Sequence, residues 1–304
     1  MRPYLQYSIA AGAALCVTAA SLVAVGGPAV AVERALSSSP QPSALTAAAG
    51  LTAAAGQTPA AGLAAAAGLT PAANVNGDRG PHAFYFTRGI YTSYGRGGWG
   101  RGSARWATDY PKADQQFLVV LRRLTNLDAY YSEHAVALND PELRRYPFVY
   151  MLEVGAMSLT QAEVDGLRGY MLAGGFVFID DFWGARDWHV FEEQMRRVLP
   201  EHEIVELPLD HPVLNSFYNI DEILQIPSIG TVRRYGGSQT TECYGCEATV
   251  RAIFDDDGHL MMLINWNTDL GDAWEWAEQP DYPTKYSTFA YQMGVNAIVY
   301  AMSH

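Results

Sequence analysis

Short runs of consecutive apolar residues alternate along the chain with stretches in which apolar residues recur every three or four positions. Residues 84–91, 147–152 and 176–180 are apolar and rich in aromatic or β-branched side chains, a composition typical of buried strands. The stretches that begin at Asp109 and Thr160 have the helical period. This alternation predicts a doubly wound α/β fold, in which helices cover both faces of a mostly parallel sheet.

Local signals predict where several elements begin and end. Thr160 and Glu163 have the spacing of a capping box, and Gly174 follows the helix that they begin. Asp187 is suited to cap the next helix. Residues 203–207 have the composition of a further strand.

The C-terminal part predicts a β-hairpin and a final helix. Two apolar runs flank residues 255–258, an acidic turn that ends in glycine, which is a hairpin signal. From about Thr284, small and apolar residues recur at helical spacing as far as Ala301. The predicted sheet is therefore mostly parallel with an added hairpin.

Residues 1–31 have the pattern of a secretory signal peptide. One charge, Arg2, precedes a small and apolar run at 9–25, and small residues end the segment, so we expect cleavage after Ala31. An uncleaved membrane anchor is the alternative, but the run is short and is followed by a break at Pro28. We expect an exported protein, periplasmic or secreted, with no membrane span after cleavage.

Residues 32–75 differ in composition from the rest of the mature chain. They contain a repeated hexamer of Ala, Gly, Thr and Leu with no side chain large enough to build a core, which predicts a disordered linker. Residues 76–304 are rich in aromatic residues and are long enough for one folded domain.

The net charge disfavours two classes of binding partner, and the cysteine content bears on the state of the two remaining thiols. The net charge is −12 at pH 7, and signal cleavage removes only one arginine, so binding to nucleic acid or to an anionic membrane is disfavoured. Cys243 and Cys246 are the cysteines left after cleavage. A disulfide is the expected state in an exported chain. Free thiols, a redox pair and metal ligands are the alternatives.

Charged residues stand where the predicted strands end, and ligands of doubly wound sheets bind at the carboxyl ends of strands. Asp180 and Asp181 end the run at 176–180. Neighbouring strand residues point to opposite faces, so at most one of them can face a given cleft, and the other would cap a turn or helix. As a catalytic residue, either would serve as a general acid/base or a metal ligand. Further ligand-binding candidates at these ends are Arg88, Glu153, Trp183 and His211.

Residues 265–276 combine oxygen-bearing and aromatic side chains. Asn265, Asn267 and Asp269 alternate, as ligands in a calcium loop do, but the glycine comes one place late for an EF-hand and Trp276 takes the place of its last glutamate. The same groups would also suit a sugar, or an Asx turn with packed tryptophans. The metal and any other cofactor stay unassigned. The ligand-binding candidates here are Asn267, Asp269, Asp272, Trp274 and Glu275.

Several longer motifs resemble one bacterial family. The segments WATDYPKAD, YPFVYMLEVGAMSLTQAE, LRGYMLAGGFVFIDDFWG, NTDLGDAWEW and GVNAIVYAMSH are similar to those of the family called domain of unknown function 4159, over nearly all of 84–304. The resemblance implies a flavodoxin-like, class I glutamine amidotransferase-like fold. It also implies envelope protein partners, of the MoxR-type ATPase or von Willebrand A-domain systems. Amidotransferases of that fold carry a cysteine nucleophile after a strand, where this chain has Asp180 and Asp181.

Two functions follow. The first is an exported cell-envelope domain that binds a ligand or a protein and lacks the cysteine nucleophile. The second is a carboxylate-dependent hydrolase of envelope carbohydrate, with or without a metal, in which Asp180 or Asp181 works with Asp269, Asp272 or Glu275. Carboxyl groups about 5–9 Å apart across a cleft would favour the hydrolase, whereas carboxylates used as helix caps would favour the binding domain.

Overall fold

The computed structural model describes residues 82–94, 104–236 and 241–304 of the chain. Within these residues the strands are β1 (Thr87–Ile90), β2 (His134–Ala137), β3 (Phe148–Leu152), β4 (Phe176–Asp180), β5 (Val205–Glu206), β6 (Thr249–Phe254) and β7 (Leu260–Trp266). The helices are α2 (Lys112–Leu124), α3 (Gln161–Met171), α4 (Gly184–Val198), α5 (Ile229–Arg234), α6 (Leu270–Glu275) and α7 (Thr284–Ala301).

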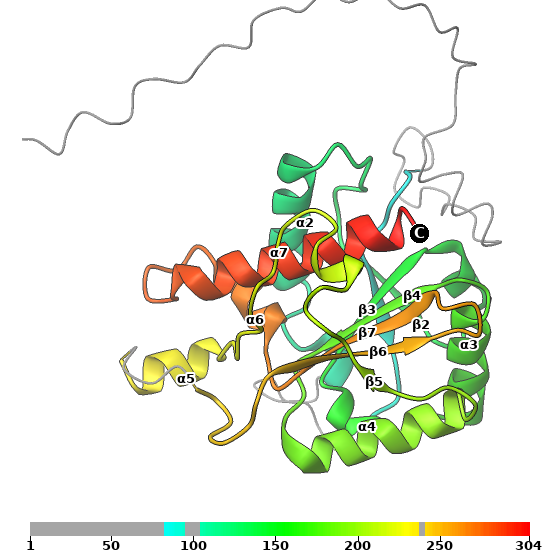
Figure 1. Cartoon of the computed structure of the whole chain (residues 1–304). Helices are drawn as coiled ribbons and strands as arrows, with labels where there is room; N and C mark the ends of the chain where they lie inside the picture. The colour runs from blue at the N-terminus through cyan, green and yellow to red at the C-terminus, as the bar shows by residue number, and fades with distance from the viewer. Residues whose placement is uncertain (1–81, 95–103, 237–240) are drawn as a thin grey trace, which may run out of the picture. The chain divides into compact units, whose positions relative to one another are not determined.

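The strands form one seven-stranded sheet in the order β2-β1-β3-β4-β7-β6-β5 (Figure 1). The neighbours from β2 to β7 are parallel, whereas β6 runs antiparallel to both β7 and β5. The predicted α/β class and the mostly parallel sheet are therefore confirmed. The carboxyl ends of β1, β3, β4 and β7 meet at one edge of the sheet, which we call the carboxyl edge.

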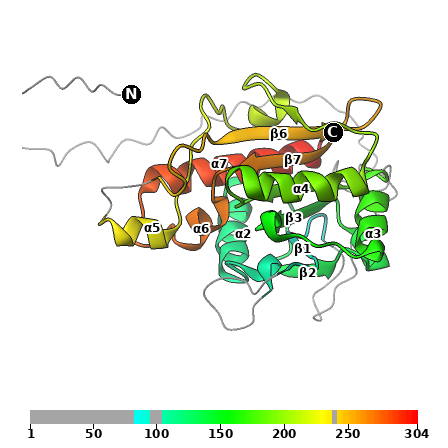
Figure 2. The ribbon, with the colours of Figure 1, turned by 90° about the horizontal axis from the view of Figure 1, so that it is seen from below.

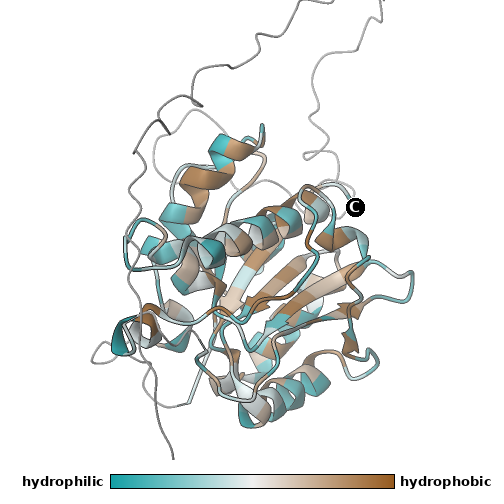
Figure 3. Cartoon of the chain, turned by 60° about the vertical axis from the view of Figure 1, so that its left-hand side comes forward, coloured by the Kyte–Doolittle hydropathy of each residue, from teal (hydrophilic) through white to brown (hydrophobic). Residues whose placement is uncertain are grey.

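Each face of the sheet carries its own hydrophobic core. On β4, Phe176 and Phe178 belong to a core with α2, α6 and α7, whereas Val177 and Ile179 belong to a core with α3 and α4. Because both faces are covered, the central strands are apolar at nearly every position. Figure 2 looks onto the side of α4, which lies across the sheet, and Figure 3 shows apolar strands enclosed by helices with hydrophilic outer sides.

The predicted helix starts are present, with two differences. Helix α2 begins at Lys112 and not at Asp109, because Asp109 has a left-handed backbone with a φ of 59°. The capping box of α3 is confirmed, because the Thr160 hydroxyl accepts from the Glu163 amide and the Glu163 carboxylate accepts from the Thr160 amide. Helix α4 begins at Gly184, before Asp187. The Asp187 carboxylate accepts a hydrogen bond from the Trp183 amide at 3.2 Å, so it stabilises the first turn from inside the helix.

The C-terminal elements also follow the prediction. Strands β6 and β7 form the hairpin around 255–258, and α7 begins at Thr284. The strand predicted at 203–207 is reduced to the two residues of β5. The sequence pattern does not predict β2, α5 or α6. Strand β2 lies at the edge of the sheet with three of its four residues only partly buried, so it lacks the apolar run of a central strand.

The signal peptide predicted at 1–31 and the linker predicted at 32–75 lie outside the described residues. Among the residues that are described, no helix combines the length and the apolar character needed to cross a membrane.

Candidate functional site

Three parallel strands end in residues with a left-handed backbone. Glu153 follows β3, Asp181 follows β4 and Asn267 follows β7, with φ angles of 53°, 52° and 61°. The Glu153 amide donates to the Asp181 carbonyl, and the Asp181 amide donates to the Thr268 carbonyl, each at 3.0 Å. Left-handed conformations are uncommon outside glycine, and strained residues are frequent at functional sites. Their concentration makes the carboxyl edge the candidate site, as the rule for doubly wound sheets predicts.

Asp180, the last residue of β4, is fully buried beneath this edge. Its Oδ2 accepts hydrogen bonds from the amides of Leu270 (2.7 Å) and Gly271 (3.2 Å), at the start of α6. Burial raises the pKa of Asp180 to about 7, against the opposing effects of the nearby Tyr150 hydroxyl and the two amides. Tyr150 and Asp180 do not reach good hydrogen-bond geometry, so the Tyr150 hydroxyl and Asp180 Oδ1 are buried without a partner among the described residues.

Asp109, Asp269 and Asp272 form what we call the acidic cluster. Each offers one carboxylate oxygen within 4.8 Å of the others. Asp109, with a φ of 59°, lies just before α2, and its Oδ2 is buried without a partner in the described part of the chain. Asp269 caps α6 by accepting from the Asp272 amide at 2.8 Å. Asp272 accepts from the Ile229 amide and, at 3.1 Å, from the Trp276 indole.

Burial and mutual repulsion raise the pKa values of the acidic cluster. The pKa of Asp109 and that of Asp269 lie well above the usual range because of burial first and neighbouring carboxylates second. Burial also raises the pKa of Asp272 to about 7, and the charge of Glu275 adds to the effect. Lys112 brings a positive charge to the rim, 3.9 Å from Glu275. Buried carboxylates in such excess are unfavourable unless protons or a bound cation neutralise them.

Asp181 and Glu153 lie together at the ends of β4 and β3. Oδ1 of Asp181 accepts from the Trp183 indole at 2.9 Å, and burial and the Glu153 charge raise the pKa of Asp181 well above its usual range. Burial raises the pKa of Glu153 as well, although its ion pair with Arg105 at 2.7 Å opposes this. Asp180 contacts α6 while Asp181 contacts Trp183, so the adjacent aspartates have separate environments, as strand alternation predicts.

Arg88 lies in β1, fully buried, and its hydrogen-bond partners are protein groups. It forms a two-pronged ion pair with Asp114 of α2, through Nε at 3.2 Å and through Nη2. Nη1 donates to the carbonyls of Trp106 (3.2 Å) and Thr108 (2.5 Å). These bonds fix the segment that carries Asp109, so the structure assigns Arg88 a positioning role below the edge.

The segment 265–276 does not converge on one ligand loop. Asn265 donates to a carbonyl of β4 at 2.9 Å, inside the sheet. Asn267 accepts from the Gly184 amide and donates to the Glu247 carbonyl, each at 2.7 Å. Of the alternating oxygens, Asp269 alone joins the acidic cluster, because the turn into α6 separates the side chains.

Trp274 and Glu275 have different surroundings despite being adjacent. Trp274 is fully buried, with its ring centroid 4.5 Å from that of Phe117 and 5.3 Å from that of Tyr150, so it belongs to the core. Glu275 lies close to Asp109, and burial raises its pKa. Trp183, in contrast, is only partly buried and stays at the edge beside Asp181.

The interpretation of His211 as a residue of the carboxyl edge is wrong. Its ring lies 5.7 Å from the Phe254 ring and 6.0 Å from the Tyr300 ring. Phe254 pairs with Leu260, the first residue of β7, so this position is at the amino end of the parallel strands. His211 caps the short helix Pro212–Leu214, which follows the turn after β5, and it lies away from the edge.

Cys243 and Cys246 are joined by a disulfide, with Cα atoms 5.4 Å apart. Tyr244, between them, is 94% exposed. The Cys246 sulfur would lie 3.9 Å from a Cβ placed on Gly184, so the disulfide loop packs against the start of α4. The loop lies on the α4 side of the sheet and contributes no residue to the acidic cluster.

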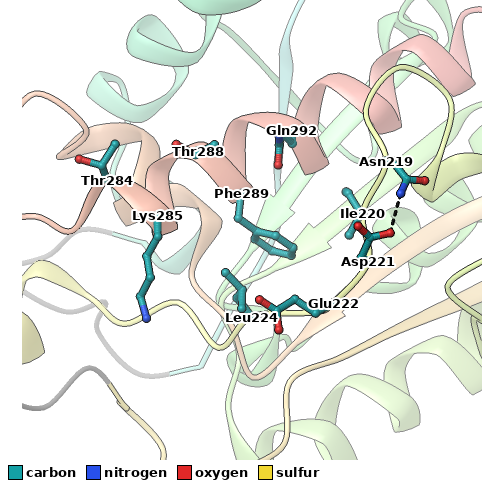
Figure 4. A pocket seen from close by; sticks show the side chains of 10 residues that line it. All are labelled: Asn219, Ile220, Asp221, Glu222, Leu224, Thr284, Lys285, Thr288, Phe289 and Gln292. Atoms are coloured by element: carbon teal, nitrogen blue, oxygen red, sulfur yellow. Dashed lines mark hydrogen bonds between the residues drawn. The ribbon is translucent and has the colours of Figure 1, made fainter.

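A surface groove of about 600 Å³ lies between α7 and the segment 219–224 (Figure 4). Its charged side chains, Asp221, Glu222 and Lys285, are exposed, and none of its lining residues belongs to the acidic cluster. Exposed charges of this kind are well solvated, so the acidic cluster is the stronger candidate for a built site.

Sequence reasoning missed Asp109 and Asp114. Asp114 had a usable signal, because it shares the helical period of the buried Leu118 and Leu121, and an acid on a buried face needs a partner. Asp109 had no such signal, since an aspartate before a helix is an ordinary start residue.

Comparison with known families matches residues 91–302 to the domain of unknown function DUF4159. A search of the curated proteins found no match to the chain.

Proposed function

The chain belongs to the DUF4159 family, and on that premise we propose an exported ligand-binding domain that has the scaffold of class I glutamine amidotransferases without their nucleophile. The order of the parallel strands, β2-β1-β3-β4-β7, supports this scaffold because it is the 2-1-3-4-5 order of flavodoxin-like proteins. Amidotransferases place a cysteine where a strand turns sharply into a helix. The corresponding turn between β4 and α4 holds Asp181, and both cysteines of the described part are joined in a disulfide elsewhere.

The ligand that we propose for the carboxyl edge is a divalent cation, Ca²⁺ or Mg²⁺. The observation that carries the proposal is the convergence of Asp109, Asp269 and Asp272, whose oxygens lie within 4.8 Å of one another. Carboxylate oxygens are the ligands that these cations prefer. A cation would also supply the charge that the cluster lacks and a partner for Oδ2 of Asp109. Asp109 as a whole residue is only partly buried, although its Oδ2 is enclosed.

The hydrogen bonds of the edge favour binding over hydrolysis. The buried carboxylate of Asp180 accepts a hydrogen bond from an amide at the start of α6, and Asp269 caps the same helix. Asp181 accepts a hydrogen bond from the Trp183 indole. A general acid/base must reach the substrate directly or through one water. Asp180 has a suitable pKa of about 7, but it is enclosed by the core. We therefore do not propose a hydrolase.

Export is the second part of the proposal. It is supported by the signal-like segment 1–31 and by the disulfide between Cys243 and Cys246, a bond typical of exported proteins. The family resemblance adds envelope proteins as candidate partners. Mass spectrometry of the exported protein should find Val32 as the first residue, and a chain that keeps residues 1–31 would contradict the cleavage.

Cation binding is tested by thermal unfolding and calorimetry of the EDTA-treated protein with CaCl₂ or MgCl₂. A cation at a hundred times its Kd should add about 2.7 kcal/mol to the free energy of unfolding, which raises the Tm by about 5–10 °C for a domain of this size. Asp109→Asn should abolish the shift. Asparagine tolerates the left-handed backbone of this position, and Oδ2 of Asp109 has no hydrogen-bond partner among the described residues that the change could remove.

Asp257→Asn is the matched control. Asp255, Asp257 and His259 form the other group of potential ligands among the described residues, in the exposed hairpin turn. If the shift disappears with Asp257→Asn and persists with Asp109→Asn, the cation binds at the hairpin and the proposal for the carboxyl edge is wrong. The absence of any shift with either cation would also contradict it.

A further inference from the structure

A cavity of about 390 Å³ lies on the α4 side of the sheet, separate from the acidic cluster. Its walls come from four places in the chain: the first residues of α4, the end of β5, the disulfide loop and the β6–β7 pair. Asn267, at the end of β7, lines it and accepts a hydrogen bond from the Gly184 amide of α4 at 2.7 Å. Segments far apart in sequence therefore build this cavity.

Arg251 of β6 is the central cation of the cavity. Its guanidinium carbon lies 4.2 Å from the ring centroid of Trp188 and 4.8 Å from that of Trp266. Glu206 lies opposite Arg251 in the β5–β6 register, yet the guanidinium of Arg251 forms no ion pair or hydrogen bond with any described residue. When the face of a guanidinium packs on aromatic rings, its orientation is fixed and the N–H donors in its plane stay available to a ligand.

Unpartnered polar atoms gather around this arginine. Nine side-chain nitrogen and oxygen atoms are buried without a partner in the described part of the chain, and three of them belong to residues that line the cavity. They are Nε of Arg251, Oγ1 of Thr249 and Nε1 of Trp266. Native proteins leave few buried polar groups unpaired, and such a concentration indicates a site that a ligand or ordered water completes.

The distribution of donors and acceptors defines the ligand. Arg251 is a donor, and the Ala185 amide belongs to the first turn of α4, where amides have no intrahelical acceptor. Glu206 and Glu247 are exposed at the rim, and their carboxylates offer acceptors to a ligand. The guanidinium matches a carboxylate or a phosphate, but the two rim glutamates repel the double charge of phosphate more strongly than the single charge of a carboxylate.

We propose that this cavity binds a small molecule that carries a carboxylate beside hydroxyl groups, the chemistry of a sugar acid. The carboxylate pairs with Arg251, the hydroxyl groups donate to Glu206 and Glu247, and the ring lies against the indole of Trp266. This site has other residues than the proposed cation site, and its central charge is positive. The proposal for it does not depend on cation binding at the acidic cluster.

The test uses the full chain in EDTA with sodium glucuronate as the probe and glucose and inorganic phosphate as comparisons, followed by calorimetry and tryptophan fluorescence. Glucuronate should bind saturably, and glucose and phosphate should bind at least about tenfold more weakly, because a hydrogen-bonded charge is worth about 1.5–3 kcal/mol. Arg251→Met should remove binding, and Arg251→Lys should weaken it about tenfold because the planar donors are lost.

Arg122→Met, an exposed change of the same kind on α2, and Asp109→Asn should both leave glucuronate binding unchanged. Arg251→Lys keeps the positive charge and the aliphatic part of the side chain. It therefore tests the role of Arg251 in glucuronate binding if Arg251→Met does not fold. Equal affinity for glucose and glucuronate, unchanged binding in Arg251→Lys, or no saturable signal up to about 10 mM glucuronate would each overturn the proposal. Loss of binding in Asp109→Asn would overturn the independence of the two sites.

Discussion

Asp180→Asn should make the protein more stable, and the gain should grow with pH. Asp180 is fully buried, and burial raises its pKa to about 7, compared with about 3.9 in an unfolded chain. Between these values the folded state holds a proton that the unfolded state has lost. The contribution of Asp180 to stability is thus largest at low pH and is lost as the pH rises toward 7. Asparagine cannot ionise, so the free energy of unfolding of the variant does not decrease with pH for this reason.

The magnitude follows from the pKa difference. Each pH unit between the two pKa values lowers the free energy of unfolding of the parent by about 1.4 kcal/mol. From pH 5 to pH 8 the loss is about 2–3 kcal/mol, because the slope ends near pH 7. The side-chain oxygen of asparagine can still accept from the amides of Leu270 and Gly271, so any cost of the substitution itself is the same at each pH.

The assay is urea unfolding of both proteins in EDTA at pH 5, 6, 7 and 8, with linear extrapolation to water. The difference in free energy of unfolding, variant minus parent, should rise by about 2–3 kcal/mol across this range. Asp257→Asn, an exposed change in the hairpin turn, should give a flat difference. A flat difference for Asp180→Asn, within about 0.5 kcal/mol, would refute the raised pKa and the electrostatic description of the edge.

Three further changes test other contacts by urea unfolding or by cation titration. Asp114→Asn leaves the buried Arg88 without its carboxylate and should cost about 3–5 kcal/mol; a cost under about 1 kcal/mol would show that the pair does not hold the loop. Thr160→Ala removes the α3 cap and should cost about 1 kcal/mol, whereas no change would mean that the capping box is not formed in solution. Gly271→Ala places a Cβ 2.6 Å from Oδ2 of Asp109, so it should weaken cation binding more than it changes the Tm; unchanged calorimetric affinity would place the cation elsewhere.

The order of elements could be predicted from the sequence because it depends on local periodicity. The run at 176–180 had to be a buried strand, Thr160 and Glu163 had to begin a helix, and the acidic turn at 255–258 had to reverse the chain. The position of Asp180 and Asp181 at a strand end followed from the same reasoning. Each of these inferences uses residues that are neighbours in the chain.

The sites depend on contacts that no local pattern contains. Asp109 meets Asp269 and Asp272 because β1 and β7 end at the same edge. Arg251 of β6 meets Trp188 of α4 and Trp266 of β7, which also contact each other, because α4 packs on the β6–β7 pair. The burial that raises the pKa of these carboxylates likewise comes from all the elements packed around them. The sequence by itself determined the central strands, the capped helix and the hairpin, and it placed the candidate site at the strand ends. The tertiary structure decided which side chains meet, because strand order and loop direction are set by long-range packing and not by periodicity.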